Sequence, residues 1–371
     1  PAMKRAALSI NHRSKWPLFH RLNTAAVSCT SQAPVATYAA RFVAQSARNP
    51  GLSVVAAGLG INLALGILYA YSMLAAEISR LFPGSGDPYA TACLAFALSM
   101  MLGGKMQDRF GPRLTALLGG LLVGAGFLFC SLTSDYWSWV FGFGVLAGSG
   151  IGFGYSAATP PALKWFPPAK TGLIAGIVVS GFGLAPVYLA PVCQYLLGRF
   201  GLHSTMMILG IAFMLIVCQL GLLLQNPPAG FTPAVSGSCT ARAKKICVDA
   251  SPDQMLRQRR FYILWLIFFV GAGAGLMVIG SIAGIAKQSM GQMAFIAVAV
   301  MAVGNAAGRI VAGILSDRIG RATTLILLLA GQSLLMFAAT RVVAGPDSGA
   351  LSVTLLATFI GFNYGSNLSL F

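Results

Sequence analysis

The feature that most constrains this chain is a nearly continuous series of long apolar stretches, from residue 51 to the end of the sequence. An α-helix rises about 1.5 Å per residue, so crossing roughly 30 Å of hydrocarbon takes about 20 apolar residues. Strands of membrane β-barrels are only about ten residues long and alternate in polarity, unlike these stretches. The sequence therefore predicts an all-α integral membrane protein. We expect ten membrane-spanning helices, at residues 54–77, 89–107, 114–132, 137–158, 171–195, 205–225, 261–286, 292–314, 322–340 and 350–371.

Composition excludes several other classes of protein. The 371 residues are 57% hydrophobic and 9% charged, whereas about a quarter of the residues in an average soluble domain are charged. A disordered tail protein would be poor in aliphatic residues. The seven cysteines are an odd number and lie mostly inside apolar stretches, which argues against a secreted disulfide scaffold.

Basic residues are distributed unevenly between the two sets of loops. The chain has 25 Lys and Arg against 8 Asp and Glu, a net charge of +17. Twenty of the basic residues lie in the N-terminal segment, the central loop and three short loops on the same side, and four lie in the opposite loops. Because cytoplasmic loops of membrane proteins are enriched in Lys and Arg, the N-terminus and the central loop are expected in the cytoplasm of a cell or inner membrane. Topology thus explains the positive charge, and no nucleic-acid partner is expected.

The spans divide the chain into four parts. Residues 1–50 lack acidic residues and are rich in Ser, Thr and Arg, as transit peptides are, but we favour a disordered basic tail or upstream sequence. Residues 51–225 form a six-helix half, and residues 261–371 form an incomplete half with four helices. The central loop, 226–260, should carry a short surface helix, since Ser251-Pro252-Asp253-Gln254 is typical of a helix start.

The loop between the second and third spans recurs between the eighth and ninth. Gly104, Asp108, Arg109 and Gly111 match Gly313, Asp317, Arg318 and Gly320 at a constant offset of 209 residues, and Arg113 and Arg321 follow the two copies. We expect the first glycine of each copy to allow close helix approach and the second to permit the turn. The Asp and Arg side chains should meet neighbouring helix ends.

This repeated GxxxDRxGxR pattern resembles the major facilitator superfamily, whose members have two six-helix halves. Further segments are similar to the oxalate–formate antiporter group and the related monocarboxylate transporters. They are Gly152-Phe153-Gly154-Tyr155, Leu163-Lys164-Trp165-Phe166-Pro167, Gly181-Phe182-Gly183, Asn226-Pro227-Pro228-Ala229-Gly230 and Asn305-Ala306-Ala307-Gly308-Arg309. The resemblance implies a secondary transporter that moves small carboxylates by alternating access. It also implies a fragment, because only about ten of the twelve helices are present, and helix eleven would supply a Lys to the carboxylate site.

Arg309 is the only ionised side chain that we place deep inside a span. An Arg at this depth costs about 2.5–3.5 kcal/mol on insertion scales, so a functional role is the default hypothesis. Its planar guanidinium suits bidentate binding of a carboxylate, and the resemblance implies this role for it. The alternative is a structural Arg that extends to the cytoplasmic interface.

Asn305 lies one helical turn before Arg309 and on the same face. Similar proton-coupled transporters carry Asp there. Because Asn cannot titrate, exchange or facilitated diffusion is favoured over proton symport. The resemblance implies that Tyr155, Phe182 and Tyr364 line the cavity, with Tyr69 and Tyr71 as further candidates, although each could serve helix packing instead. Asn363 and Asn367 could face the cavity or bond across helices.

Other functions stay open on the sequence alone. They are transport of a drug or another organic anion with a structural Arg309, and proton-coupled monocarboxylate symport. An enzyme is not expected, because the three His lie outside the spans and no nucleophile with a base or metal cluster is evident. Cys239 and Cys247 lack zinc-site spacing. We thus expect no metal and no cofactor, and a monomer in the lipid bilayer whose partner is a small organic anion.

The orientation can be tested with Cys239 in the central loop. A membrane-impermeant thiol reagent should label Cys239 in inverted vesicles and leave it unlabelled in intact cells, because the charge asymmetry places this loop in the cytoplasm. Strong labelling of Cys239 from outside would reverse the predicted orientation.

Overall fold

The computed structural model describes residues 50–84, 86–228, 230–231, 252–290, 294–344 and 350–370. All of them belong to one compact unit, Ser46–Phe371. The predicted N-terminal tail and most of the predicted central loop, including Cys239 and Cys247, lie outside the described residues.

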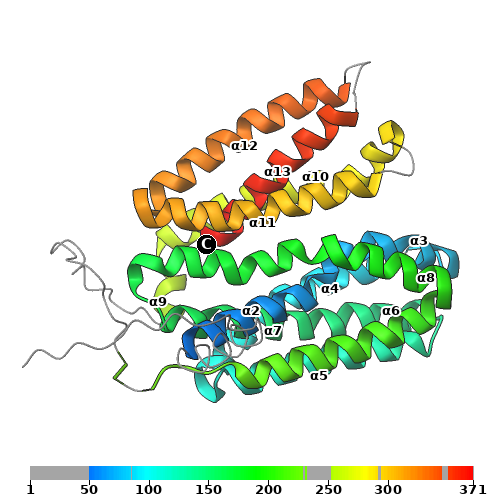
Figure 1. Cartoon of the computed structure of the whole chain (residues 1–371), viewed down its shortest axis with the longest axis horizontal. Coiled ribbons are helices and arrows are strands. Elements are labelled where there is room, and N and C mark those ends of the chain that lie inside the picture. The colour runs from blue at the N-terminus through cyan, green and yellow to red at the C-terminus, as the bar shows by residue number, and fades with distance from the viewer. Residues whose placement is uncertain are drawn as a thin grey trace, which may run out of the picture. The chain divides into compact units, whose positions relative to one another are not determined.

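The described residues are helical at every predicted span, and no β-strand occurs among them (Figure 1). The elements are α2 (Pro50–Leu65), the 3₁₀ segment η1 (Gly66–Ala70), α3 (Tyr71–Leu81), α4 (Asp87–Phe110), α5 (Pro112–Ser131), α6 (Tyr136–Trp139), the π-helical segment η2 (Val140–Ala147), α7 (Gly148–Lys164), the 3₁₀ segment η3 (Pro168–Lys170), α8 (Thr171–Leu223), α9 (Pro252–Leu256), α10 (Arg259–Met290), α11 (Ala294–Ile319), α12 (Arg321–Ala344) and α13 (Ala350–Leu370). The short helix α9 lies where the Ser-Pro-Asp-Gln segment predicts one.

The first, fifth and sixth spans differ from the separate, continuous helices that the sequence predicts. The first span is broken by η1, where Gly66 approaches the backbone of α8 too closely for any larger residue. The fifth and sixth spans run together in α8 and are separated only by Gly201, whose φ of 74° interrupts the helix. A left-handed conformation of this kind is easily adopted only by glycine, so Gly201 supplies the turn that we expected over a longer loop.

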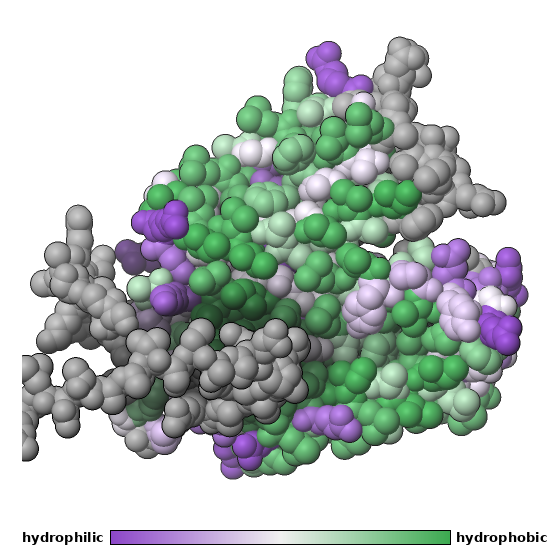
Figure 2. Space-filling view, in the orientation of Figure 1, coloured by the Kyte–Doolittle hydropathy of each residue, from purple (hydrophilic) through white to green (hydrophobic). Residues whose placement is uncertain are grey.

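The outer faces of the helices are apolar. Figure 2 shows hydrophobic side chains over most of the face in view, with hydrophilic ones mostly near helix ends. Large apolar side chains such as Leu94, Met101 and Leu334 are more than half exposed, as expected of residues that contact lipid. Eight stretches of the described residues are long and apolar enough to cross a membrane, and one of these, Pro168–Leu223, holds two predicted spans. Helix α13, which corresponds to the tenth predicted span, is not among the eight.

Glycines hold α11 against its two main neighbours, α8 and α13. Gly304 and Gly308 on α11 contact backbone carbonyls of α13, and Gly361 and Gly365 on α13 contact backbone carbonyls of α11. Both pairs have the GxxxG spacing that lets membrane helices pack backbone to backbone. On the other side of α11, Gly176 of α8 lies against the carbonyl group of Arg309. These contacts fix the helix that carries Asn305 and Arg309.

The packing predicts different outcomes for two glycines. A methyl group at Gly308 would overlap the carbonyl oxygen of Phe362, whereas one at Gly273 would meet nothing within 4 Å. We expect Gly308→Ala to lower stability by about 1–3 kcal/mol, the usual cost of overpacking, and Gly273→Ala to leave it nearly unchanged. Thermal unfolding of the purified protein in detergent measures both variants, and equal midpoints would contradict the close contact.

Candidate functional site

Arg309 is completely buried, and it is the only charged side chain among the buried residues that the structure describes. Its Nε donates a hydrogen bond to Oδ1 of Asn305 at 2.9 Å, and its Nη1 donates to the carbonyl oxygen of Val179 at 2.6 Å. Its Nη2 lies 3.5 Å from the hydroxyl oxygen of Tyr69. The guanidinium therefore does not reach the protein surface but is held between the helices by three neutral groups.

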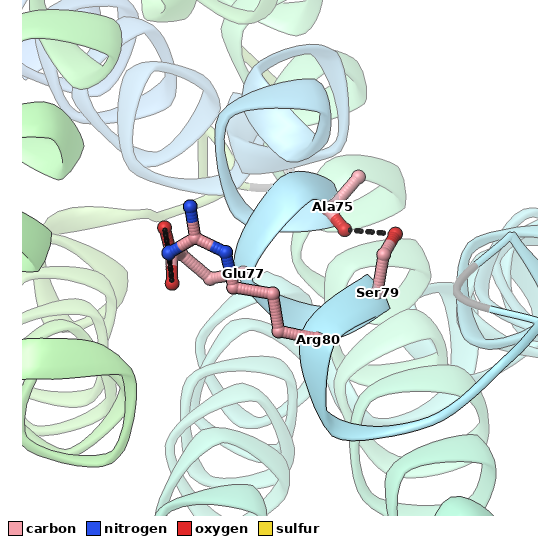
Figure 3. A network of polar contacts seen from close by, with 4 residues as sticks. All are labelled: Ala75, Glu77, Ser79 and Arg80. Atoms are coloured by element: carbon pink, nitrogen blue, oxygen red, sulfur yellow. Dashed lines mark hydrogen bonds and ion pairs between the residues drawn. The ribbon is translucent and has the colours of Figure 1, made fainter.

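No carboxylate neutralises this charge within the part of the chain that the structure describes. The ion pair found there joins Arg80 to Glu77 on α3, where Nη1 and Oε1 are 2.7 Å apart (Figure 3). That pair is at the surface, with the Arg80 side chain 75% exposed. Arg309 is thus a buried cation whose hydrogen-bond partners carry no charge.

Two tyrosine hydroxyls meet next to Arg309. The hydroxyl oxygens of Tyr69, on η1, and Tyr364, on α13, are 2.9 Å apart. Tyr69 reaches this position because Gly66, one turn earlier, lies close to the carbonyl group of Phe182: a Cβ at Gly66 would come within 2.7 Å of that oxygen. The break in the first span therefore presents Tyr69 to Arg309.

An aromatic wall adjoins the tyrosine pair. The ring of Phe182 packs edge-on against Tyr69 at 5.1 Å and against Tyr155 at 5.5 Å between ring centroids. Phe96 on α4 completes the wall, 5.6 Å from Tyr155 and 6.2 Å from Phe182. Sequence reasoning missed Phe96, since an aromatic residue in an apolar span carries no distinguishing local signal.

The structure brings together the six residues that we proposed for substrate binding. They are Arg309, Asn305, Tyr155, Phe182, Tyr364 and Tyr69. Tyr71 instead packs against Tyr89 and Phe143, each with centroids 5.0 Å away. Asn363 and Asn367 bond across to α12 rather than to Arg309.

The second copy of the duplicated loop meets a helix end, as we expected. Asp317 accepts hydrogen bonds from the backbone N–H groups of Gly172 at 3.0 Å and Leu173 at 2.9 Å, at the start of α8. Gly313 packs directly on Gly172, and Gly320 turns the chain with a φ of 91°. The side chains of Arg318 and Arg321 are exposed.

The first copy corresponds to this arrangement only in part. Gly111 turns the chain with a φ of 88°, and Nε of Arg113 donates to the carbonyl oxygen of Leu224, at the end of α8, at 2.9 Å. The close approach expected at Gly104 is not found among the described residues, because a Cβ there would meet nothing within 4 Å. The neighbouring Gly103 makes that contact instead, against Ser156. Asp108 and Arg109 are exposed, and the guanidinium of Arg109 lies over the ring of Phe110.

Residues 51–371 match the family model described as Major Facilitator Superfamily. The chain belongs to this superfamily. It is therefore an integral, multi-pass membrane protein of a transporter family, as the GxxxDRxGxR repeat predicts.

Several relatives are each identical to this chain at about a quarter of the aligned residues. The chain is 27% identical to the uncharacterized MFS-type transporter YhjX of Escherichia coli (strain K12), over 84% of this chain and 76% of the relative. It is 26% identical to the oxalate:formate antiporter of Oxalobacter formigenes, over 82% and 72%. It is 28% identical to the human monocarboxylate transporter 11, over 85% and 68%.

Solved structures show the same fold. The fucose:proton symporter FucP of E. coli aligns with a TM-score of 0.59 at 15% identity, covering 86% of this chain and 87% of FucP. At this identity the likeness concerns the fold alone. The all-α major facilitator fold predicted from the sequence is thereby confirmed.

Proposed function

We propose that this transporter exchanges small carboxylates across the membrane, and that Arg309 binds the carboxylate group of the cargo. The observation that carries the proposal is the burial of Arg309 without a carboxylate partner among the described residues. An Arg at bilayer depth costs about 2.5–3.5 kcal/mol on insertion scales, so an Arg that is retained there is expected to serve function. Similarity to the oxalate:formate antiporter and to monocarboxylate transporter 11 supports the choice of cargo.

The chemistry of the site fits a small anion that presents a carboxylate group to Arg309. A carboxylate that leaves water loses its hydration, and neutral hydrogen bonds return too little of that free energy. A guanidinium has five N–H donors, and the three contacts described for Arg309 leave two of them for a ligand. The Tyr69 and Tyr364 hydroxyls bond to each other, which uses one of their two protons and leaves the other to be donated to a ligand. The surrounding aromatic edges exclude water, which strengthens the charged contact.

The arrangement favours exchange over proton symport. Asn305, which occupies the position next to the Arg309 guanidinium, has no titratable proton. The buried residues that the structure describes include no Asp or Glu. An unloaded site would leave the Arg309 charge without an anion during the return step, and exchange avoids this because another carboxylate returns in its place.

Arg309 can be tested by transport in liposomes. We expect Arg309→Lys to cause a severe loss of uptake of labelled oxalate, formate, pyruvate or lactate, because an ammonium lacks the planar pair of donors. Arg309→Gln should nearly abolish uptake, since losing one partner of a buried charged contact costs about 2–5 kcal/mol, or roughly 30-fold or more in affinity.

The matched control is Arg80→Gln, which removes an exposed guanidinium from its surface pair with Glu77 and should transport normally. Both variants should insert into the membrane in equal amounts. Wild-type rates in Arg309→Gln would make Arg309 structural and remove the main physical support for a carboxylate cargo.

Coupling can be tested with Asn305→Asp. A carboxylate at this position would pair with Arg309 and occupy the charge that the cargo needs, so transport at neutral pH should fall. Transport should recover only under acidic conditions that protonate the new carboxyl group and so remove its charge. The wild type should exchange carboxylates without stoichiometric proton uptake. Substrate-driven alkalinisation outside wild-type proteoliposomes would contradict exchange without protons.

A further inference from the structure

A buried amide network links α10, α12 and α13 on the side of α13 away from α11. Gln332 of α12 donates from Nε2 to the carbonyl oxygen of Gly271 on α10 at 2.7 Å, and its Oε1 accepts a bond from Nδ2 of Asn367 on α13 at 3.0 Å. Asn363 donates from Nδ2 to the carbonyl oxygen of Leu328 on α12 at 2.8 Å. The side chains of Gln332, Asn363 and Asn367 are at most 7% exposed. The Gln332 side chain of α12 is therefore hydrogen-bonded to both α10 and α13.

Tyr364 lies between the two helices that Gln332 joins. Its ring packs on Gly275 of α10, where a Cβ would come within 2.5 Å of a ring carbon. Gly275 is one helical turn after Gly271, whose carbonyl group Gln332 binds, and Asn367 is one turn after Tyr364 on α13. The distance and rotation between α10 and α13 that Gln332 fixes therefore also set the space available to the Tyr364 ring.

We infer that Gln332 is a positioning residue for the carboxylate site, acting through the Tyr364 hydroxyl. The inference rests on the proposed function, because Tyr364 matters there through its bond to Tyr69 beside Arg309. Gln332 itself touches neither Arg309 nor the aromatic wall in the described contacts. A hydrogen bond aligned to within a few tenths of an ångström is lost when its ring shifts, so a distant amide can alter binding.

Gln332→Met tests the inference, because Met has a similar length and flexibility but lacks both hydrogen bonds. We expect the KM for labelled pyruvate or oxalate to rise about threefold to twentyfold, the range for losing the one bond between Tyr364 and Tyr69, with Vmax little changed. In a Tyr364→Phe background the same substitution should leave KM unchanged, since the hydroxyl is already absent. A merely structural role would lower Vmax or protein amount equally in both backgrounds.

Two further variants keep the test decisive. Ser333→Ala is the matched control, because Ser333 is the next residue on α12 and its exposed hydroxyl bonds only to Leu329 of its own helix. It should leave KM unchanged. Gly275→Ala pushes on the Tyr364 ring from α10 and should raise KM only when Tyr364 is present as tyrosine. If Gln332→Met fails to insert, Gly275→Ala alone decides whether displacement of Tyr364 alters binding.

A spectroscopic readout separates this inference from the proposed function. With 3-fluorotyrosine at position 364, Gln332→Met should shift or broaden the fluorine resonance of the protein in detergent, and Ser333→Ala should not. An unchanged resonance in Gln332→Met overturns the positioning role whatever the transport result. A changed resonance together with normal transport in Arg309→Gln would support the positioning of Tyr364 by Gln332 but contradict the carboxylate proposal on which its effect on binding rests.

Discussion

The interaction on which the rest of the structure depends is the hydrogen bonding of a fully buried guanidinium by neutral groups. Isolated in a low-dielectric interior, the Arg309 charge would cost several kcal/mol, and its three bonds return only part of that. Each bond comes from a different element: Asn305 from α11 itself, Val179 from α8 and Tyr69 from η1. Maintaining the charge therefore requires these elements to meet with little tolerance.

Glycine contacts around α11 allow the helices to meet this closely. Gly176 lies against the Arg309 backbone from α8, and Gly365 lies against the Asn305 backbone from α13. Gly183 leaves room for the Asn305 amide oxygen, which a Cβ there would approach to 3.0 Å. Side chains at these positions would separate the helices and draw the donors and acceptors of Arg309 out of range. The dense glycines of the spans are thus part of how a charged residue is kept inside the membrane.

Hydropathy alone predicts nearly all of the helices, because about 20 apolar residues in succession allow no other structure in a bilayer. The pairing of Asn305 with Arg309 also follows from sequence, since residues four apart share a helix face. The positions of Tyr155, Phe182 and Tyr364 came from the family resemblance, and periodicity alone could not have supplied them. The break at η1 was missed, because no proline marks it and its cause is a contact with α8, far along the chain.

Phe96 and Gln332 could not be found from local sequence for the same reason. Their partners lie tens of residues away in the sequence. Phe96 and Gln332 differ from other Phe and Gln residues in the spans only through these distant contacts. Gly104 is the opposite case, in which the sequence predicts a contact that the structure lacks. Gly104 matches Gly313 in the repeat, but among the described residues Gly313 packs closely on Gly172 and Gly104 has no such neighbour.

The two copies of the duplicated loop show how the same residues acquire different roles from their neighbours. Asp317 satisfies two of the free N–H groups at the start of α8, and a negative charge there is further stabilised by the helix dipole. A bond pair of this kind contributes about 0.5–2 kcal/mol. Any separation of α8 from α11 on this side must break both bonds together with the Gly172–Gly313 contact. Arg309 lies about two turns before Asp317 on α11 and donates to Val179 on the same helix α8. A movement of α8 away from α11 at the loop would therefore also pull on the bond that holds the guanidinium.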